Sequence, residues 1–170
     1  MLRLMTGTTL HKALRQRILI LDGAMGTMIQ RHGLTEQDYR GSDFANHESD
    51  LFGCNDLLSI TRPEIISGIH QEYLEAGANI IETNTFNATS ISLADYNLEG
   101  QVRAINMAAV KTAQDAVNAV QAKNPDHLCF VAGSIGPTSK TASLSPDVND
   151  PTYREVSFED LRAAYYEQVS

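Results

Sequence analysis

The chain has 170 residues, of which 42% are hydrophobic, and carries a formal net charge of −8. Its length suits one domain or part of one, since domains usually span ~100–200 residues, and its apolar content excludes a disordered protein. The acidic balance and the lack of a Lys/Arg run exclude a nucleic-acid or anionic membrane surface. No apolar stretch approaches the ~18–20 residues that cross a bilayer. We therefore expect no nucleic-acid partner and no membrane association.

The two cysteines, Cys54 and Cys129, form neither a CxxC pair nor a disulfide framework. They are interpreted as reduced thiols in a reducing compartment. Residues 1–21 contain basic residues and no acid, which is also a property of transit peptides. Because this segment has no serine and runs directly into an apolar run, an ordinary helix is favoured over a targeting signal. We predict a cytoplasmic protein.

Three short apolar runs, at residues 18–21, 78–81 and 128–132, predict buried parallel strands, because they are nearly continuous rather than alternating. Helical patterns separate them. Thr61–Glu64 has the sequence of a capping box, and Gly77 stands where a helix C-cap belongs. Residues 101–123 carry an apolar stripe at helical spacing, and Ser157 begins another helix. The order strand, helix, strand, helix, strand, helix implies right-handed crossovers and a parallel sheet.

Polar side chains stand at the end of each expected strand, on the same face as its apolar residues: Asp22, Glu82 with Asn84, and Ser134. A doubly wound sheet and a TIM (β/α)8 barrel both fit this layout, because both place their chemistry at the C-terminal ends of strands. We favour the barrel. A closed barrel needs at least ~200 residues, so the chain is interpreted as its N-terminal part, about three to four βα units.

The Asp22-Gly23 turn suits a small anionic ligand such as an amino-acid carboxylate, because glycine exposes backbone N–H groups. A plain turn with a solvated aspartate is the alternative. Glu82 could hold a cationic amine, orient a metal ligand or satisfy backbone donors. Two irregular segments, Arg31–Ser59 and Ser139–Val156, exceed the usual loop length and are expected to cover a pocket at these strand ends.

Five segments carry a family resemblance: LDGAMGTMIQ, GCNDLLSITRPEII, EYLEAGANIIETNTFNATSISLADY, VAGSIGPTSKTASLSPDVNDPTYR and SFEDLRAAY. Together they resemble the N-terminal, homocysteine-binding domain of cobalamin-dependent methionine synthases, from about Ile18 to Ser170. The resemblance implies a 5-methyltetrahydrofolate–homocysteine methyltransferase, in which homocysteine takes a methyl group from methylcobalamin to give methionine. Folate and cobalamin domains of the parent chain would be its partners.

The resemblance also implies a site. Three cysteine thiolates hold zinc in that family, and the zinc binds the homocysteine sulfur. The turn matching Asp22-Gly23 offers N–H groups to the homocysteine carboxylate, and the residues matching Glu82, Asn84 and Ser134 line the same rim. Cys54 and Cys129 match no zinc position, and the zinc cysteines are expected beyond Ser170. The family's amine-binding acid is also missing, and Ala24 replaces a frequent glycine.

We therefore expect that this chain alone has no catalytic or metal-binding residue, binds neither zinc nor methylcobalamin tightly, and is inactive. Two alternatives remain open. One is a stand-alone zinc-dependent homocysteine S-methyltransferase that uses betaine or S-methylmethionine. The other is a non-catalytic half barrel that acts as a binding module. An incomplete barrel leaves an open sheet edge, which would favour self-association.

Overall fold

The computed structural model describes residues 5–170, with side chains from Thr9 onward. Its helices and strands are, in chain order, α1 (Met5–Gln16), α2 (Met25–Gln30), α3 (Glu36–Arg40), α4 (Leu58–Thr61), α5 (Pro63–Glu75), β1 (Ile80–Glu82), α6 (Ser90–Leu93), α7 (Val102–Lys123), β2 (Phe130–Ala132) and α8 (Phe158–Val169). Short 3-10 turns occupy Asn55–Leu57, Ala94–Tyr96 and Glu99–Gln101. None of the helices in this part of the chain is long and apolar enough to span a membrane.

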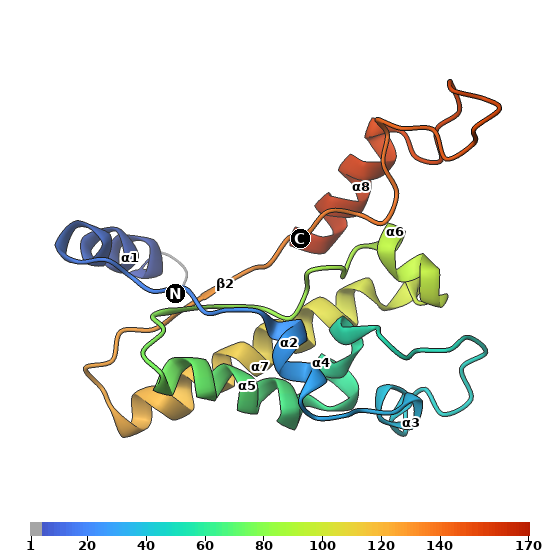
Figure 1. Ribbon diagram of the computed structural model, residues 1–170. Coiled ribbons are helices and arrows are strands. Elements are labelled where there is room, and N and C mark those ends of the chain that lie inside the picture. The colour runs from blue at the N-terminus through green and yellow to red at the C-terminus, as the bar shows by residue number, and fades with distance from the viewer. Residues whose placement is uncertain (1–4) are drawn as a thin grey trace.

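The sheet is small and parallel (Figure 1). β1 pairs with β2 in the register Ile80 to Phe130, and Leu21 forms a single parallel bridge to Ile80 on the other edge of β1. The three extended segments therefore lie side by side in chain order, with helices between them. This arrangement confirms the predicted parallel βα order and resembles part of a barrel. A closed barrel is not present within residues 5–170.

The first expected strand, at residues 18–21, differs from the prediction. Only Leu21 pairs with β1 by a bridge, and Ile18 and Ile20 are 90% and 58% exposed instead of buried. The physical reason is that one edge and one face of this segment meet no other described strand, so its apolar side chains have nothing to pack against. Residues 1–4, which belong to the expected N-terminal helix, lie outside the described residues.

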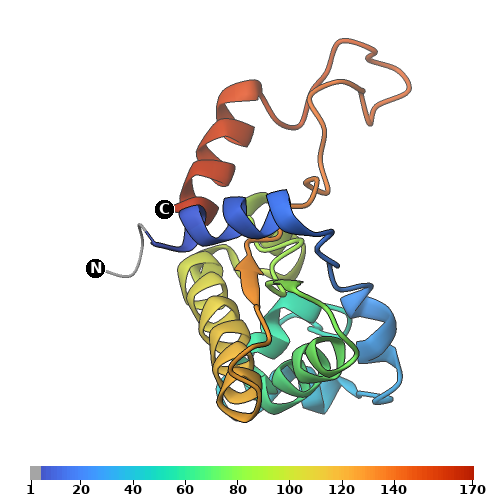
Figure 2. The ribbon, with the colours of Figure 1, turned by 90° about the vertical axis from the view of Figure 1, so that its left-hand side faces the viewer.

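The core has two parts, and the helices α5 and α7, which pack along each other, contribute to both (Figures 1 and 2). One part lies against β1, and the larger part lies among the helices α2 to α7. The predicted apolar stripe of residues 101–123 is confirmed, since its members on α7 are all buried: Ile105, Ala109, Thr112, Ala116 and Val120. Ile66, Ile69 and Leu74 of α5 form the opposing surface and are fully enclosed. This packing fixes the position of β1 and β2 relative to the segments that precede and follow them.

The helix caps agree only in part with the sequence prediction. Ser157 caps α8 in a capping box with Asp160, as expected. Gly77 follows α5 with φ +109°, a conformation that glycine adopts without strain. The expected capping box at Thr61 is wrong. Thr61 ends α4, its hydroxyl faces Leu57 O, and Arg62 precedes α5 without a side-chain cap.

The segment Arg31–Ser59 is more regular than expected, because it contains α3 and a 3-10 turn. Glu36 organises it by accepting hydrogen bonds from the backbone amides of Leu51 and Phe52. Residues 139–156 contain no helix or strand and project away from the body of the molecule (Figures 1 and 2). The two loops are thus different in kind, and only the first remains close to the strand ends.

Candidate functional site

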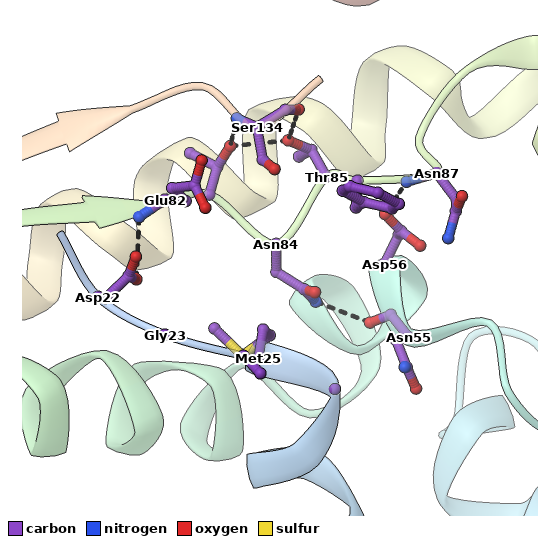
Figure 3. A pocket seen from close by; sticks show the side chains of 14 residues that line it. Asp22, Gly23, Met25, Asn55, Asp56, Glu82, Asn84, Thr85, Asn87 and Ser134 are labelled. Carbon is purple, nitrogen blue, oxygen red and sulfur yellow. Dashed lines mark hydrogen bonds between the residues drawn. The ribbon is translucent and has the colours of Figure 1, made fainter. Parts of the chain in front are cut away.

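A cavity of about 480 Å³ opens at the C-terminal ends of the extended segments (Figure 3). Its lining comprises Asp22, Gly23, Ala24, Met25, Gly26, Asn55, Asp56, Glu82, Thr83, Asn84, Thr85, Phe86, Asn87 and Ser134. All five residues that the sequence singled out for substrate binding are in this set: Asp22, Gly23, Glu82, Asn84 and Ser134. The structure therefore brings the three strand ends together around one space.

Asp22 links the first segment to β1. Its backbone N–H donates to Ile80 O at 2.9 Å, and its Oδ2 accepts from the Glu82 N–H at 3.0 Å. The other oxygen, Oδ1, is buried and has no partner among the described residues. Burial raises the pKa of Asp22 to about 6, and the nearby Glu82 carboxylate adds to the rise, while the hydrogen bond from Glu82 opposes it.

A pair of threonine hydroxyls holds Ser134 at the cavity. Thr83 Oγ1 accepts from the Ser134 N–H at 3.0 Å, and Thr85 Oγ1 donates to Ser134 O at 2.8 Å. The two hydroxyls are 2.7 Å apart, so Thr83 must supply the proton that joins them, because Thr85 has already used its own. The Ser134 side-chain hydroxyl has no hydrogen-bond partner among the described residues and is available to a ligand.

Asn84 is buried and positions the loop before α4. Its side-chain nitrogen donates to Asn55 O at 2.7 Å and lies 3.3 Å from Ser59 Oγ. Asn55 in turn accepts from the Tyr39 hydroxyl at 2.9 Å. Asn84 thus serves the architecture of the cavity through its amide nitrogen, in addition to lining it.

Asp56 is the chief lining residue that the sequence prediction missed. It is 4% exposed, and its Oδ1 accepts from the Asn87 N–H at 2.9 Å. Burial raises its pKa to about 6, opposed by the bond from Asn87. The sequence signal was weak, since an Asn-Asp pair inside a long segment looks like ordinary turn chemistry. Its approach to the cavity depends on the fold of Arg31–Ser59.

The projecting segment Ser139–Val156 contributes no residue to this cavity, so the expectation that both long loops cover it is wrong.

Met25 lines the cavity and also packs on the core, whereas Met28 is buried in the core. The cavity wall combines the apolar Met25 and Phe86 with the carboxyl groups of Asp22, Asp56 and Glu82, and no Lys, Arg or His is among the lining residues. Such a wall suits a ligand with a cationic group and an apolar chain.

Residues 19–170 match the family described as homocysteine S-methyltransferase. The chain belongs to this family. Solved structures of the Escherichia coli homocysteine methyltransferase MmuM are similar. The metallated form matches with a TM-score of 0.68 and 28% identity, over 94% of this chain and 51% of that one. The oxidized form matches with a TM-score of 0.60 and 31% identity, over 75% and 40%. The chain thus spans about half the length of MmuM or less.

One MmuM structure is metallated, which raises the question of whether this member of the homocysteine S-methyltransferase family has a metal site of its own. No group of three His, Cys, Asp or Glu side chains suited to a metal occurs in residues 5–170 as described. Cys54 is buried, and burial together with the Asp56 charge raises its pKa to about 12; burial also raises the pKa of Cys129. Neither thiol favours the thiolate that zinc requires. The described residues therefore do not fit a zinc ion.

Proposed function

We propose that this chain is the N-terminal, homocysteine-binding portion of a cobalamin-dependent methionine synthase. The observation that carries the proposal is the convergence of Asp22, Glu82, Asn84 and Ser134 on one cavity in a chain of the homocysteine S-methyltransferase family. The motifs IIETNTF and DVNDP support the methionine synthase branch of that family. In the cell we expect a cytoplasmic protein whose other domains carry folate and cobalamin.

The cavity offers complementary groups for each part of homocysteine. The backbone N–H groups of Gly23 and Ala24 donate to no acceptor among the described residues, so they are free to bind the α-carboxylate. Glu82 makes no ion pair within the part of the chain that the structure describes, and its carboxylate is free to bind the α-ammonium group. Met25 and Phe86 give the methylene chain an apolar contact. These residues bind and orient the substrate, and none of them is proposed to react with it.

Zinc and methylcobalamin would be bound by other residues of the parent chain. Zinc holds the substrate sulfur as a thiolate when it is bound. Because the described residues do not fit that ion, we propose no chemical step for this chain by itself. We also propose that its open sheet edge, beside Leu21 or beside β2, is completed by further strands of the parent or by another copy.

The alternative function is a stand-alone homocysteine methyltransferase, which the similarity to MmuM favours. The identity of the methyl donor distinguishes the two functions. A parent enzyme of the methionine synthase type should form methionine from methylcobalamin and not from S-methylmethionine or betaine. The reverse donor preference would reject the methionine synthase proposal while leaving homocysteine as the acceptor.

The direct test is calorimetric titration of the chain with L-homocysteine, with and without Zn²⁺. We expect weak binding that Zn²⁺ does not strengthen, and a further loss of about 5- to 30-fold in Glu82→Gln, since a charged hydrogen bond is worth ~1.5–3 kcal/mol before solvent screening. Exposed Glu72 on α5 gives the matched control Glu72→Gln, which should bind as the wild type does. The proposal fails if the wild type binds no homocysteine, or if both variants lose affinity equally.

A further inference from the structure

Helix α8 lines no part of the cavity, yet it holds the two segments that leave β1 and β2. The Tyr165 hydroxyl donates to Gly136 O at 2.9 Å, and the Gln168 side-chain nitrogen donates to Thr85 O at 2.8 Å. Figures 1 and 2 show that the C-terminal end of α8 approaches the rest of the molecule while its other end stands apart. The helix therefore meets the site through its last turns.

The segment Thr85–Asn87 forms one wall of the cavity and is held by three separate elements. Gln168 of α8 donates to Thr85 O, the Gly136 N–H donates to Phe86 O at 3.0 Å, and Asp56 accepts from the Asn87 N–H. This segment is irregular and has no repeating ladder of backbone bonds. Each of these contacts therefore holds one residue of the wall. Thr85 is held in addition by its hydroxyl, which donates to Ser134 O, and by the Ala88 N–H, which donates to Thr85 O at 3.2 Å.

The sequence of α8 explains why the same face carries both donors. Leu161, Ala164, Tyr165 and Gln168 recur at helical spacing, and Ala164 and Gln168 are buried. Gln168 Oε1 is also buried, and it has no partner among the described residues. Enclosing an unpaired amide oxygen is unfavourable, so packing alone does not account for glutamine here. The bond from the Gln168 side-chain nitrogen to Thr85 O is the favourable contact that offsets the cost of burying the amide.

We propose that Tyr165 and Gln168 are positioning residues for homocysteine binding. They touch no substrate themselves, and they act by fixing Thr85–Asn87 and the Ser134–Gly136 segment against each other. This inference rests on the proposed function for the identity of the ligand. The geometry itself, two side chains of one helix on two backbone carbonyls beside the cavity, is independent of that identity.

The experiment compares Tyr165→Phe and Gln168→Met with Tyr166→Phe. Tyr166 is the matched control, because it lies on the same helix, is 69% exposed, and its hydroxyl bonds to no described residue. For each variant, NMR measures hydrogen exchange of the Asn87 and Gly136 amides without ligand, calorimetry measures L-homocysteine affinity, and thermal unfolding measures stability. Both test variants should exchange faster at these amides and lose about 3- to 10-fold in affinity, the effect of one neutral hydrogen bond. The control should match the wild type in all three.

Unchanged exchange in both test variants would overturn the positioning role. Faster exchange with unchanged affinity would also overturn it, because the contacts would then be purely structural. The same holds if the loss of affinity equals the fraction of unfolded protein at the assay temperature. If the wild type binds no homocysteine, the proposed function fails, and the exchange measurement still decides whether α8 fixes the cavity wall.

Discussion

The carboxylate of Asp22 accepts a hydrogen bond from the backbone amide of Glu82, which is 60 residues away in sequence and 3.0 Å away in space. This contact joins the end of the first extended segment to the end of β1. Both residues line the cavity, so this bond, together with the bond from the Asp22 N–H to Ile80 O, fixes the relative position of the two segment ends there.

The Glu82 amide should report the ionisation of Asp22. Because the pKa of Asp22 is raised to about 6, we expect the Glu82 amide proton shift to titrate with a midpoint near pH 6 and to lose this step in Asp22→Asn. The Thr152 amide is an internal control, since it donates to Asp150, whose pKa is lowered by hydrogen bonds from Thr152. Its midpoint should lie below the ordinary aspartate pKa of 3.8. A Glu82 midpoint below 4 would contradict the burial of Asp22.

Removing the charge of Asp56 should stabilise the protein at alkaline pH. The pKa of Asp56 is about 6 in the folded chain and 3.8 ordinarily, so the folded state favours the protonated side chain. The contribution of Asp56 to the free energy of unfolding is therefore fully present below pH 3.8 and is lost as pH rises through 6. A shift of two units corresponds to about 3 kcal/mol at most. Asp56→Asn should therefore unfold at higher urea concentration than the wild type at pH 8, with little difference at pH 4.

Exposed Asp95 lines a smaller neighbouring cavity together with Asp56 and supplies the control. Asp95→Asn should change the free energy of unfolding by less than about 0.5 kcal/mol at pH 8. Equal effects of the two substitutions would mean that net charge, and not the burial of Asp56, governs the response.

Gly136 cannot accept a side chain without movement of the cavity wall. A Cβ at this position would lie 2.3 Å from Phe86 O, the atom to which the Gly136 N–H donates. We expect Gly136→Ala to lower the free energy of unfolding by about 1–3 kcal/mol, as overpacking does, and to weaken homocysteine binding. At Gly133 a Cβ meets nothing within 4 Å, so Gly133→Ala should be nearly neutral. Urea denaturation of both variants checks this, and equal stabilities would refute the steric argument.

His70 should make the fold sensitive to acid. It is fully buried, neither ring nitrogen has a partner among the described residues, and burial lowers its pKa from 6.5 to about 4. The unfolded chain therefore binds the extra proton between these values, and stability falls as pH drops from 6.5 to 4, by about 3 kcal/mol in total. His70→Leu should remove this part of the dependence in urea denaturation at pH 7 and pH 4.5.

The control for this prediction is His32→Gln, because His32 is exposed. It should leave the free energy of unfolding within about 0.5 kcal/mol of the wild type at both pH values. If His70→Leu keeps the full acid sensitivity, groups other than His70 are responsible.

Local sequence patterns were informative where the physical cause is local. The stripe of α7 and the Ser157 cap of α8 depend on neighbours within one or two turns, and both were predicted correctly. Alternation along an extended segment places Glu82 and Asn84 on one face. The expected gathering of polar strand ends follows from this alternation and from parallel pairing, and the structure shows it. The substrate roles of these residues stay predictions.

Other features were decided by tertiary structure alone. The local signal at Thr61 was overridden because residues 58–61 continue as helix, and the apolar run at 18–21 is exposed because nothing described covers it. The contacts of Asp56 with Asn87 and of Gln168 with Thr85 join residues 31 and 83 positions apart. No short-range periodicity encodes such pairs. They arise only when the packed helices bring separate backbone segments within hydrogen-bonding distance.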